Sequence, residues 1–306
     1  MNEDVVKKYI AAGEIAEKVK ERAMREVKPG VKILSLVSTL ENYVVELGGK
    51  PAFPINVSIN NEAAHRTAYI DDESVLPEDG IVKVDIGVHI DGCIADTAIT
   101  IAFSERYSEL VDATREALEK ALKNIKPGIR ASEVGSIVEK VIRSRGFKVI
   151  RNLSGHSLAE YTIHAGETIP NYKDSLNFTR LRPRAAYAIE PFASTGRGVV
   201  YDEKRVSIYA IRPTSILREI SEGHILTSIY GKSRTLPFSE RWFPDLIALL
   251  GISRFREILR ELSKTGYLIP YPVLSDIPGS YVAQFEETVL VLDERSVIVT
   301  TNRSIL

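Results

Sequence analysis

The stretch IVKVDIGVHI at residues 81–90, followed by Asp91-Gly92 and then CIADTAITIA at residues 93–102, is the clearest structural signal in the chain. Apolar residues alternate through both segments, which is typical of strands. Asp-Gly between two such segments strongly favours a tight hairpin turn. We therefore expect an antiparallel hairpin, and the rest of the chain is interpreted outward from it.

Each strand of this hairpin carries one aspartate, Asp85 and Asp96. A two-residue turn makes Asp85 face Ala98 and leaves Asp96 diagonal to it on the same face, about 7–8 Å away. A four-residue turn would place the two directly opposite, and a three-residue turn would separate them unless a bulge intervened. Because buried like charges repel, a same-face register favours one or two divalent cations. The alternative is that each aspartate is exposed or hydrogen-bonded.

An internal repeat flanks the hairpin. Lys28-Pro29-Gly30-Val31 recurs as Lys126-Pro127-Gly128-Ile129. Helical spacing precedes each copy, at about 4–26 and 105–124, and Pro-Gly ends the helix. A second helix follows each copy, near 34–47 and 131–145, and an extended segment comes next. Chance coincidence is the alternative; otherwise the pattern predicts a duplicated α+β domain of helix–helix–strand units, with its site between the halves.

The last third of the chain combines further strands with a block of different character. Strands are expected at 185–189, 282–292 and 296–300. Residues 202–270 are predicted to be mostly helical, with apolar spacing at 216–230 and 242–265. This block has no partner in the first half, so we interpret residues 201–270 as an insertion and residues 1–200 with 271–306 as one catalytic domain.

Bulk composition excludes several function classes. The 306 residues carry 40 basic and 41 acidic side chains, a net charge of −1, so no global field favours nucleic acid or an anionic membrane. No apolar run approaches the ~20 residues of a membrane helix. Cys93 is the only cysteine, which excludes an internal disulfide and fits a reducing compartment. We expect a cytoplasmic protein.

Three further residues match the chemistry of the two aspartates. His156 lies in Leu-Ser-Gly-His-Ser, Glu190 follows a short apolar strand, and Glu286 interrupts another. Taken singly, each is more often structural, although a glutamate buried in a strand needs a partner. Together, four carboxylates and one imidazole are the ligand set expected for a pair of Mn, Fe, Co or Zn ions.

At these residues the sequence resembles the type 2 methionine aminopeptidases, in an archaeal-like form, with their pita-bread fold. The resemblance rests on motifs spread over nearly the whole chain, in order: Ala52-Phe53-Pro54-Ile55-Asn56, Ala63-Ala64-His65, Val84-Asp85-Ile86-Gly87, Asp96, Ser154-Gly155-His156-Ser157, Ile163-His164-Ala165-Gly166, Ile189-Glu190-Pro191-Phe192, Tyr271-Pro272 and Ala283-Gln284-Phe285-Glu286-Glu287-Thr288. It implies a curved antiparallel sheet, with the helical block as the insertion that marks type 2 enzymes.

The resemblance also implies roles for the candidate residues. Asp85, Asp96, His156, Glu190 and Glu286 would bind two divalent cations of uncertain identity. Asp96 and Glu286 would bridge them, Asp85 would chelate one, and His156 and Glu190 would complete the other. The ions would activate a water for attack on the carbonyl after the first residue, and Glu190 would relay its proton.

The implied substrate site adds five positions. His65 and His164 would line it and act on the carbonyl and the developing oxyanion, while Phe53, Ile163 and Tyr271 would wall the methionine pocket. The substrate would be the N-terminal peptide of a nascent protein with a small second residue; the ribosome is left open as a partner, and a monomer is expected.

Four positions fall outside the family pattern. Glu287 stands where many relatives carry histidine, and we expect it to point away from the metals. The segment Ser207-Ile208-Tyr209 lies near where some relatives supply another pocket histidine, and here that position is apolar. His89 and His224 match no motif, so solvated or turn roles are expected for both.

Three other functions remain as alternatives. A proline-specific dipeptidase or a creatinase-like hydrolase would share the fold but typically carries an additional N-terminal domain. A non-catalytic relative that binds RNA or ribosomes would lack metal ligands, whereas all five positions are filled here. A structural calcium protein is disfavoured by the histidine and by the scarcity of calcium-type loops.

Overall fold

Two Lys-Pro-Gly turns of the same conformation define the two halves of the molecule. The computed structural model describes residues 1–213 and 223–302. Gly30 and Gly128 both have φ of 77°, a left-handed conformation that favours glycine. Gly30 N–H donates to Leu76 O at 3.0 Å, as Gly128 N–H donates to Leu181 O at 2.7 Å. The predicted internal repeat is therefore confirmed, down to the hydrogen bonds of its turns.

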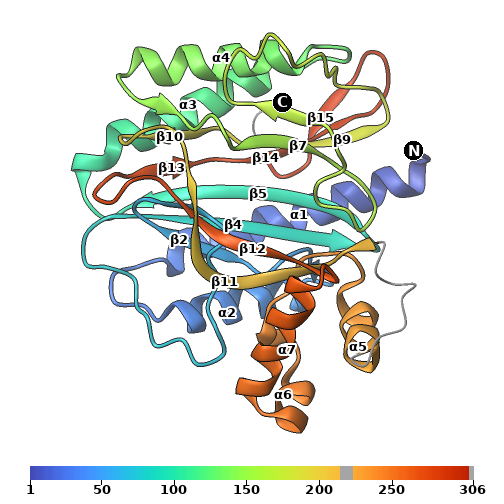
Figure 1. The fold of residues 1–306 in the computed structure, drawn as a ribbon. Helices are drawn as coiled ribbons and strands as arrows, with labels where there is room; N and C mark the ends of the chain where they lie inside the picture. Colours follow the sequence, from blue (N-terminus) through green and yellow to red (C-terminus); the bar gives the residue numbers. More distant parts are fainter. Residues whose placement is uncertain (214–222, 303–306) are drawn as a thin grey trace.

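Each repeat contains a pair of helices, one before and one after its Lys-Pro-Gly turn. Both pairs pack against the strands that lie between them (Figure 1). The helices of the two halves are α1 (Glu3–Glu26), α2 (Ile33–Glu46), α3 (Ser108–Asn124) and α4 (Ala131–Ser144). A short 3₁₀ turn, η1 (Glu105–Tyr107), stands where the sequence predicted the start of the third helix. The apolar spacing of α3 buries Leu110, Ala113, Ala117 and Ala121.

The strands form four small antiparallel sheets. In the first half they are β1 (Lys50–Pro51), β2 (Asn56–Ile59), β3 (Glu62–Ala64), β4 (Ile81–Ile90) and β5 (Cys93–Ala102). In the second half they are β6 (Lys148–Val149), β7 (Ser154–Leu158), β8 (Thr168–Pro170), β9 (Ala185–Ile189), β10 (Phe192–Ser194), β13 (Val282–Gln284), β14 (Glu287–Val291) and β15 (Val297–Val299). This mixture of helices and antiparallel strands confirms the α+β class.

The seam between the halves runs along β5 and relies on hydroxyl groups. Within residues 1–213 and 223–302, one pair of residues, Ala98 and Glu286, exchanges two backbone hydrogen bonds across it, at 3.2 and 3.0 Å. On one side, Thr288 Oγ1 accepts from Asp96 N–H and donates to Asp96 O. On the other side, Thr100 Oγ1 makes the same two contacts with Gln284. A hydroxyl both accepts and donates, so each threonine replaces a backbone pairing partner.

Glu286 lies in a break rather than inside a strand. The sequence predicted one strand over 282–292, but the structure divides it into β13 and β14 with Phe285 and Glu286 between them. Phe285 N–H donates to Pro191 O, and Glu286 pairs with Ala98. The strand therefore changes partners at this point, from β10 to β9, which turns the Glu286 side chain toward the site.

The block at 201–270 is less helical than the sequence predicted. Its ends are two long paired strands, β11 (Tyr201–Ile211) and β12 (Leu268–Ser275). Between them lie α5 (Gly223–Ser233), η3 (Glu240–Trp242), α6 (Pro244–Leu250) and α7 (Ile252–Lys264), which project below the sheets in Figure 1. Gly251, with φ of 78°, separates α6 from α7. The predicted helix at 216–230 is described only from residue 223, and its first part lies outside the described residues.

The described part of the chain has no helix that is both long and apolar enough to cross a bilayer.

Candidate metal centre

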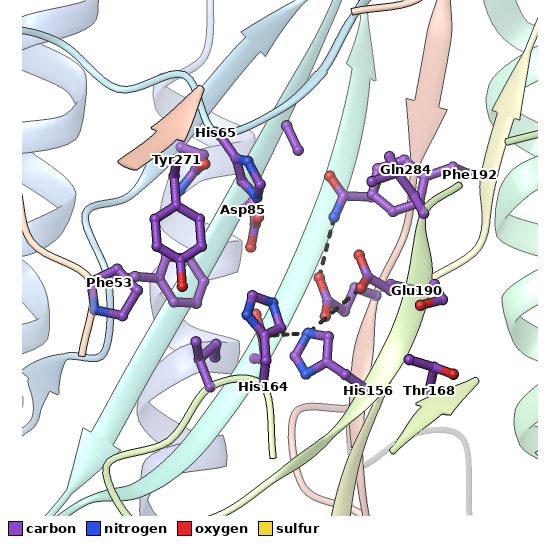
Figure 2. Close-up of a pocket in the computed structure, with 18 of the residues that line it drawn as sticks. Phe53, His65, Asp85, His156, His164, Thr168, Glu190, Phe192, Tyr271 and Gln284 are labelled. Atoms are coloured by element: carbon purple, nitrogen blue, oxygen red, sulfur yellow. Dashed lines mark hydrogen bonds and ion pairs between the residues drawn. The ribbon is translucent and has the colours of Figure 1, made fainter. Parts of the chain in front are cut away.

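Five predicted ligand residues converge at the centre of the sheets from five separate stretches of chain (Figure 2). Asp85 comes from β4, Asp96 from β5 and His156 from β7, while Glu190 follows β9 and Glu286 lies between β13 and β14. All five side chains line one cavity. The structure therefore brings together the whole set that the sequence proposed.

The hairpin has the two-residue turn that was considered first. Asp91 and Gly92 have positive φ angles of 47° and 88°, as a type I′ turn requires. Asp85 pairs with Ala98, and Gly87 pairs with Asp96. The two aspartates are consequently diagonal on one face of the hairpin, and the three-residue and four-residue turns are excluded.

The ligand atoms lie close enough to share cations. His156 Nε2 is 3.8 Å from Asp96 Oδ2 and 3.5 Å from Glu190 Oε1. Asp96, His156 and Glu286 each offer one possible ligand atom, and these three atoms all lie within 4.8 Å of one another. Asp85 Oδ1, Asp96 Oδ1 and Glu286 Oε1 are buried without a hydrogen-bond partner among the described residues. Buried oxygens without donors cost free energy unless a cation neutralises them, so these residues fit divalent metal.

The electrostatics of the cluster support the same interpretation. Burial raises the pKa of Asp85 to about 7. Burial and the neighbouring carboxylates raise the pKa values of Asp96, Glu190 and Glu286 well above the usual range. Burial also lowers the pKa of His156 to about 3, which keeps its ring neutral. Neutral imidazole and closely spaced carboxylates are the forms that bind divalent metal ions.

The cavity above the cluster has a volume of about 330 Å³, and all five predicted substrate residues line it. Phe53 and Ile163 are buried walls, and His164 is exposed to solvent. The ring of Tyr271 meets the ring of His65 edge-on, with 5.2 Å between the ring centroids. It lies roughly parallel to the ring of His164, with 6.2 Å between the centroids. An apolar pocket with a few convergent polar groups is typical of a ligand site.

The position of the Phe53 ring depends on the absence of a side chain at Gly87. A Cβ at Gly87 would lie 2.3 Å from Phe53 Cε1, far inside van der Waals contact. Gly87 follows Asp85 by two residues on β4, so the same strand carries a ligand and makes room for a pocket wall.

His65 is held in an unusual backbone conformation at the edge of the cavity. Its φ is 65°, which is uncommon for a residue other than glycine and often marks a functional site. Its Nδ1 lies 3.2 Å from Pro272 O. Because a carbonyl only accepts, Nδ1 carries the proton and Nε2 is left as an acceptor.

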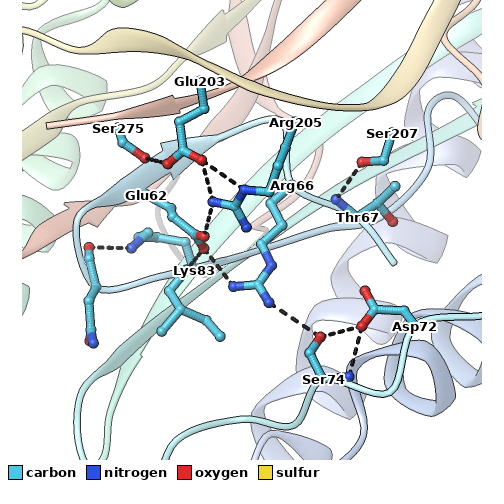
Figure 3. A network of polar contacts seen from close by, with 12 residues as sticks. Glu62, Arg66, Thr67, Asp72, Ser74, Lys83, Glu203, Arg205, Ser207 and Ser275 are labelled. Carbon is cyan, nitrogen blue, oxygen red and sulfur yellow. Dashed lines mark hydrogen bonds and ion pairs between the residues drawn. The ribbon is translucent and has the colours of Figure 1, made fainter. Parts of the chain in front are cut away.

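A charged network includes Glu62 and Arg66, which stand on either side of His65 in the chain (Figure 3). Arg66 Nη1 and Arg205 Nη2 donate to Glu62 at 2.8 and 2.6 Å. Arg205 also pairs with Glu203 on β11. The network joins β3, which precedes His65, to the strand pair of the insertion.

Sequence analysis assigned no role to two residues that line the site. Gln284 Nε2 donates to Glu286 Oε2 at 3.2 Å, and Asn56 pairs with Asp85 across β2 and β4. Both belong to the motifs quoted above, and Gln284 is the only glutamine in the chain. Their neutral side chains carry no charge signal, so only their position in a fold reveals them.

The four positions outside the family pattern have structural roles or lie at the rim. Glu287 points away from the cluster and binds Lys20 Nζ at 2.7 Å. Ile208 is buried and lines the cavity. His89 is buried, and of the two roles expected it has the turn role, because its Nδ1 accepts from Gly92 N–H in the turn. His224 is exposed on α5, as expected.

Comparison with known proteins identifies the family of this chain. The sequence profile of metallopeptidase family M24 matches residues 7–293. The chain belongs to metallopeptidase family M24. A metallopeptidase family implies the use of divalent metal, and the group Asp96, His156 and Glu286 is a possible place for such an ion.

Two relatives within M24 align over almost their entire length. The methionine aminopeptidase of Pyrococcus horikoshii is 44% identical over 297 residues, which is 97% of this chain and 99% of the relative. The methionine aminopeptidase of Saccharolobus solfataricus is 42% identical over 303 residues, which is 98% of this chain and 99% of the relative. The crystal structure of methionine aminopeptidase from Thermotoga maritima superposes with a TM-score of 0.70 at 25% identity, covering 99% of this chain and 98% of that one. The resemblance found in the sequence motifs is thus confirmed.

Proposed function

We propose that this protein is a type 2 methionine aminopeptidase that hydrolyses the initiator methionine from nascent proteins in the cytoplasm. The observation that carries the proposal is the convergence of four carboxylates and one imidazole at the base of a cavity with apolar walls. Relatives named as methionine aminopeptidases match almost the entire chain. Removal of one N-terminal residue is the activity that suits both observations.

Asp85, Asp96, His156, Glu190 and Glu286 would hold two divalent cations. Asp96 and Glu286 are the candidates for bridging ligands, because they are the most deeply buried carboxylates of the set and adjoin the seam between the halves. When bound, such ions supply Lewis-acid activation of a water and of the scissile carbonyl, and hold the substrate α-amine. Mn, Fe, Co and Zn all suit this ligand set.

The other polar groups of the site have separable tasks. Glu190 is suited to hold and transfer a proton, because its buried carboxyl has a raised pKa and Oε1 faces His156. His65 presents the acceptor Nε2, so it is better placed to receive an N–H from the substrate than to stabilise an oxyanion. His164, exposed at the mouth, is the remaining candidate for a donor to the developing oxyanion.

The methionine side chain would occupy the apolar part of the cavity. Phe53, Ile163 and Tyr271 form its walls, and Ile208 and Pro237 complete it from the segment 201–270. We therefore assign that segment to an insertion that closes one side of the pocket of a catalytic domain made of residues 1–200 and 271–306. A short adjoining subsite would exclude large second residues of the substrate by steric clash.

The alternative activities are not favoured by any feature of the site. The prolidase from Pyrococcus furiosus shares the fold with a TM-score of 0.61, but this chain covers only 64% of it. A non-catalytic relative has no need of a cluster of buried carboxylates, since burying them without metal opposes folding.

The test is hydrolysis of the peptides Met-Ala-Ser and Ala-Pro-Ala by the purified protein, first in EDTA and then with added Mn or Co. We expect cleavage of Met-Ala-Ser only, and only with metal. Cleavage of Ala-Pro-Ala would indicate a proline-specific enzyme. Absence of Met-Ala-Ser turnover with added Mn and with added Co would refute the aminopeptidase assignment.

A further inference from the structure

A second cavity, larger than the first, lies between α2 and the insertion. Its volume is about 790 Å³. One wall is the face of α2 that carries Leu34, Ser38, Glu41, Asn42 and Val45, spaced as neighbours along one side of a helix. The opposite wall comes from the end of α5 and from η3, which lie below the sheets in Figure 1. None of the five proposed metal ligands lines it.

The body of this second cavity is apolar. Leu34, Pro51, Ile70 and Leu236 line it, together with the indole of Trp242. Trp242 Nε1 donates to Glu41 Oε2 at 3.0 Å, so its polar atom is satisfied and the ring offers a flat contact surface. Such a lining suits the hydrocarbon or aromatic part of a small molecule.

The charge of the second cavity is positive. Among the described residues that line it, the one acidic side chain is Glu41, which is neutralised by two hydrogen bonds of 2.8 Å from Arg241. Lys50 and Lys232 also line the cavity, and within the described part of the chain neither forms an ion pair with a carboxylate. Lys232 Nζ donates to the backbone oxygen of Trp242 and lies 5.6 Å from the centroid of the Phe243 ring, contacts that leave its charge without an anionic partner. Two ammonium groups without a carboxylate partner among the described residues therefore remain beside an apolar surface.

Two buried polar groups add hydrogen-bonding capacity. Ser233 is 4% exposed, and its Oγ has no partner among the described residues. His89 is 6% exposed, and its Nδ1 accepts from Gly92 N–H. The proton of the neutral ring is then on Nε2, which makes no hydrogen bond to any described residue. Lys50 pairs with His89 across β1 and β4, so the two side chains leave the same face of this strand pair.

We propose that the second cavity binds a small organic anion: an apolar or aromatic body against Trp242, and a carboxylate, phosphate or sulfonate held by Lys50 and Lys232 with His89 and Ser233. An anionic group would accept hydrogen bonds from the buried donors of Ser233 and His89. It would also neutralise the two lysines, which have no anionic partner among the described residues. The cation that Glu41 already neutralises, Arg241, holds the wall and is not part of the anion site.

The second cavity shares a wall with the first. Pro51 and Leu236 line the second cavity, while Phe53, two residues after Pro51, and Pro237, directly after Leu236, line the first. A ligand bound on one side therefore contacts the segments that shape the other. This coupling rests on the proposed function, because the first cavity would be the methionine pocket.

Trp242 is the only tryptophan in the chain, so its fluorescence reports directly on the second cavity. The probe is 8-anilinonaphthalene-1-sulfonate, titrated into the full-length, folded protein. We expect saturable quenching of Trp242 with one dye per chain. The double variant Lys50→Glu/Lys232→Glu should weaken binding about tenfold or more. The matched control Lys123→Glu/Lys126→Glu, with the same charge change on exposed positions of the other half, should leave the dissociation constant unchanged.

The same titration separates the possible errors. Equal affinity in the two double variants, or displacement of the dye by free methionine, would overturn the anion site. The neutral analogue without the sulfonate should bind more weakly; equal binding would also contradict the proposal. Because the measurement requires no turnover, it remains informative if the aminopeptidase assignment fails. With the dye saturating, the KM for Met-Ala-Ser should change about twofold or more, and an unchanged KM would refute the coupling alone.

Discussion

The two halves of the molecule supply the metal centre by different means. The first half delivers Asp85 and Asp96 on one hairpin, whose strands are joined by two residues. The second half pairs β9 with β14, with the whole segment from Glu190 to Glu286 between them. A local hairpin fixes its geometry by turn type and register, whereas the second pair depends on tertiary contacts. The comparison explains why ligand geometry could be worked out from the residues on one side only.

Removing the aspartate at the seam should have the largest effect on activity. We expect Asp96→Ala to lower kcat/KM for Met-Ala-Ser by roughly a thousandfold or more, because a shared ligand of both ions would be lost. Circular dichroism should show that the fold survives. Asp112→Ala, an exposed aspartate on α3, is the control and should retain full activity. Substantial activity in Asp96→Ala would show that the hairpin does not supply a bridging ligand.

The contact between α1 and the second half should have the next largest effect, on stability. Lys20 Nζ and Glu287 are both buried and lie 2.7 Å apart. Lys20→Met leaves Glu287 without a cation and should destabilise the fold by about 3–5 kcal/mol in denaturant titrations. Lys7→Met, which breaks an exposed pair with Glu3, should have little effect.

Replacing both partners sharpens this test. Lys20→Met/Glu287→Leu should recover much of the lost stability, because the unpaired charge is gone. A double variant as unstable as Lys20→Met would mean that Lys20 acts through its bonds to Thr97 and Thr301 instead.

Much of the fold was predictable, because its signals are local. The Lys-Pro-Gly turns, the four long helices and the hairpin all follow from short stretches of sequence. The strand β11 was missed because charged residues fill its first part, Asp202 to Arg205, and hide the alternation that appears only from Val206. The break at Glu286 was missed because it arises when a strand changes partners, which a periodic pattern does not reveal.

The site divides in the same way. The diagonal arrangement of Asp85 and Asp96 on one face followed from the two-residue turn. The roles of His156, Glu190 and Glu286 as ligands of the same metal centre were inferred through family resemblance. Gln284 and Asn56 lie in the quoted motifs but received no role, since an amide in an apolar stretch has no distinctive sequence signal. The acceptor state of His65 Nε2 depends on Pro272 O, a contact between distant residues.

The pH dependence of metal-free stability should isolate the contribution of the hairpin. The folded-state pKa of Asp85 is about 7, against an ordinary value of 3.8, so the folded protein holds this proton more tightly than the unfolded chain. The stabilisation that this protonated carboxyl contributes to the fold is complete below the ordinary pKa, and it is lost as pH rises toward 7. In EDTA, Asp85→Asn, which cannot ionise, should therefore melt progressively higher than the parent across this window, by about 4 °C or more at its upper end. A constant difference in Tm would contradict the raised pKa.

The smallest expected effect comes from the pocket wall. Gly87→Ala places a Cβ against Phe53 and should raise KM for Met-Ala-Ser about tenfold while kcat changes less, because ground-state binding is affected. Gly223→Ala, at a position without a positive φ and with nothing near its Cβ position, tests whether loss of a glycine alone has this consequence. A kcat defect without a change in KM would place Phe53 outside the substrate site.

The threonine seam has a consequence for how ion binding and folding are linked. Thr100 and Thr288 fasten β5 to the opposite half with side chains rather than with a continuous strand. Ligands divided between the two halves would make each captured ion a reversible crosslink across that boundary. Chelation should consequently loosen the join itself, so that protease sensitivity and amide exchange increase first along β5 and β14, ahead of the helices outside them.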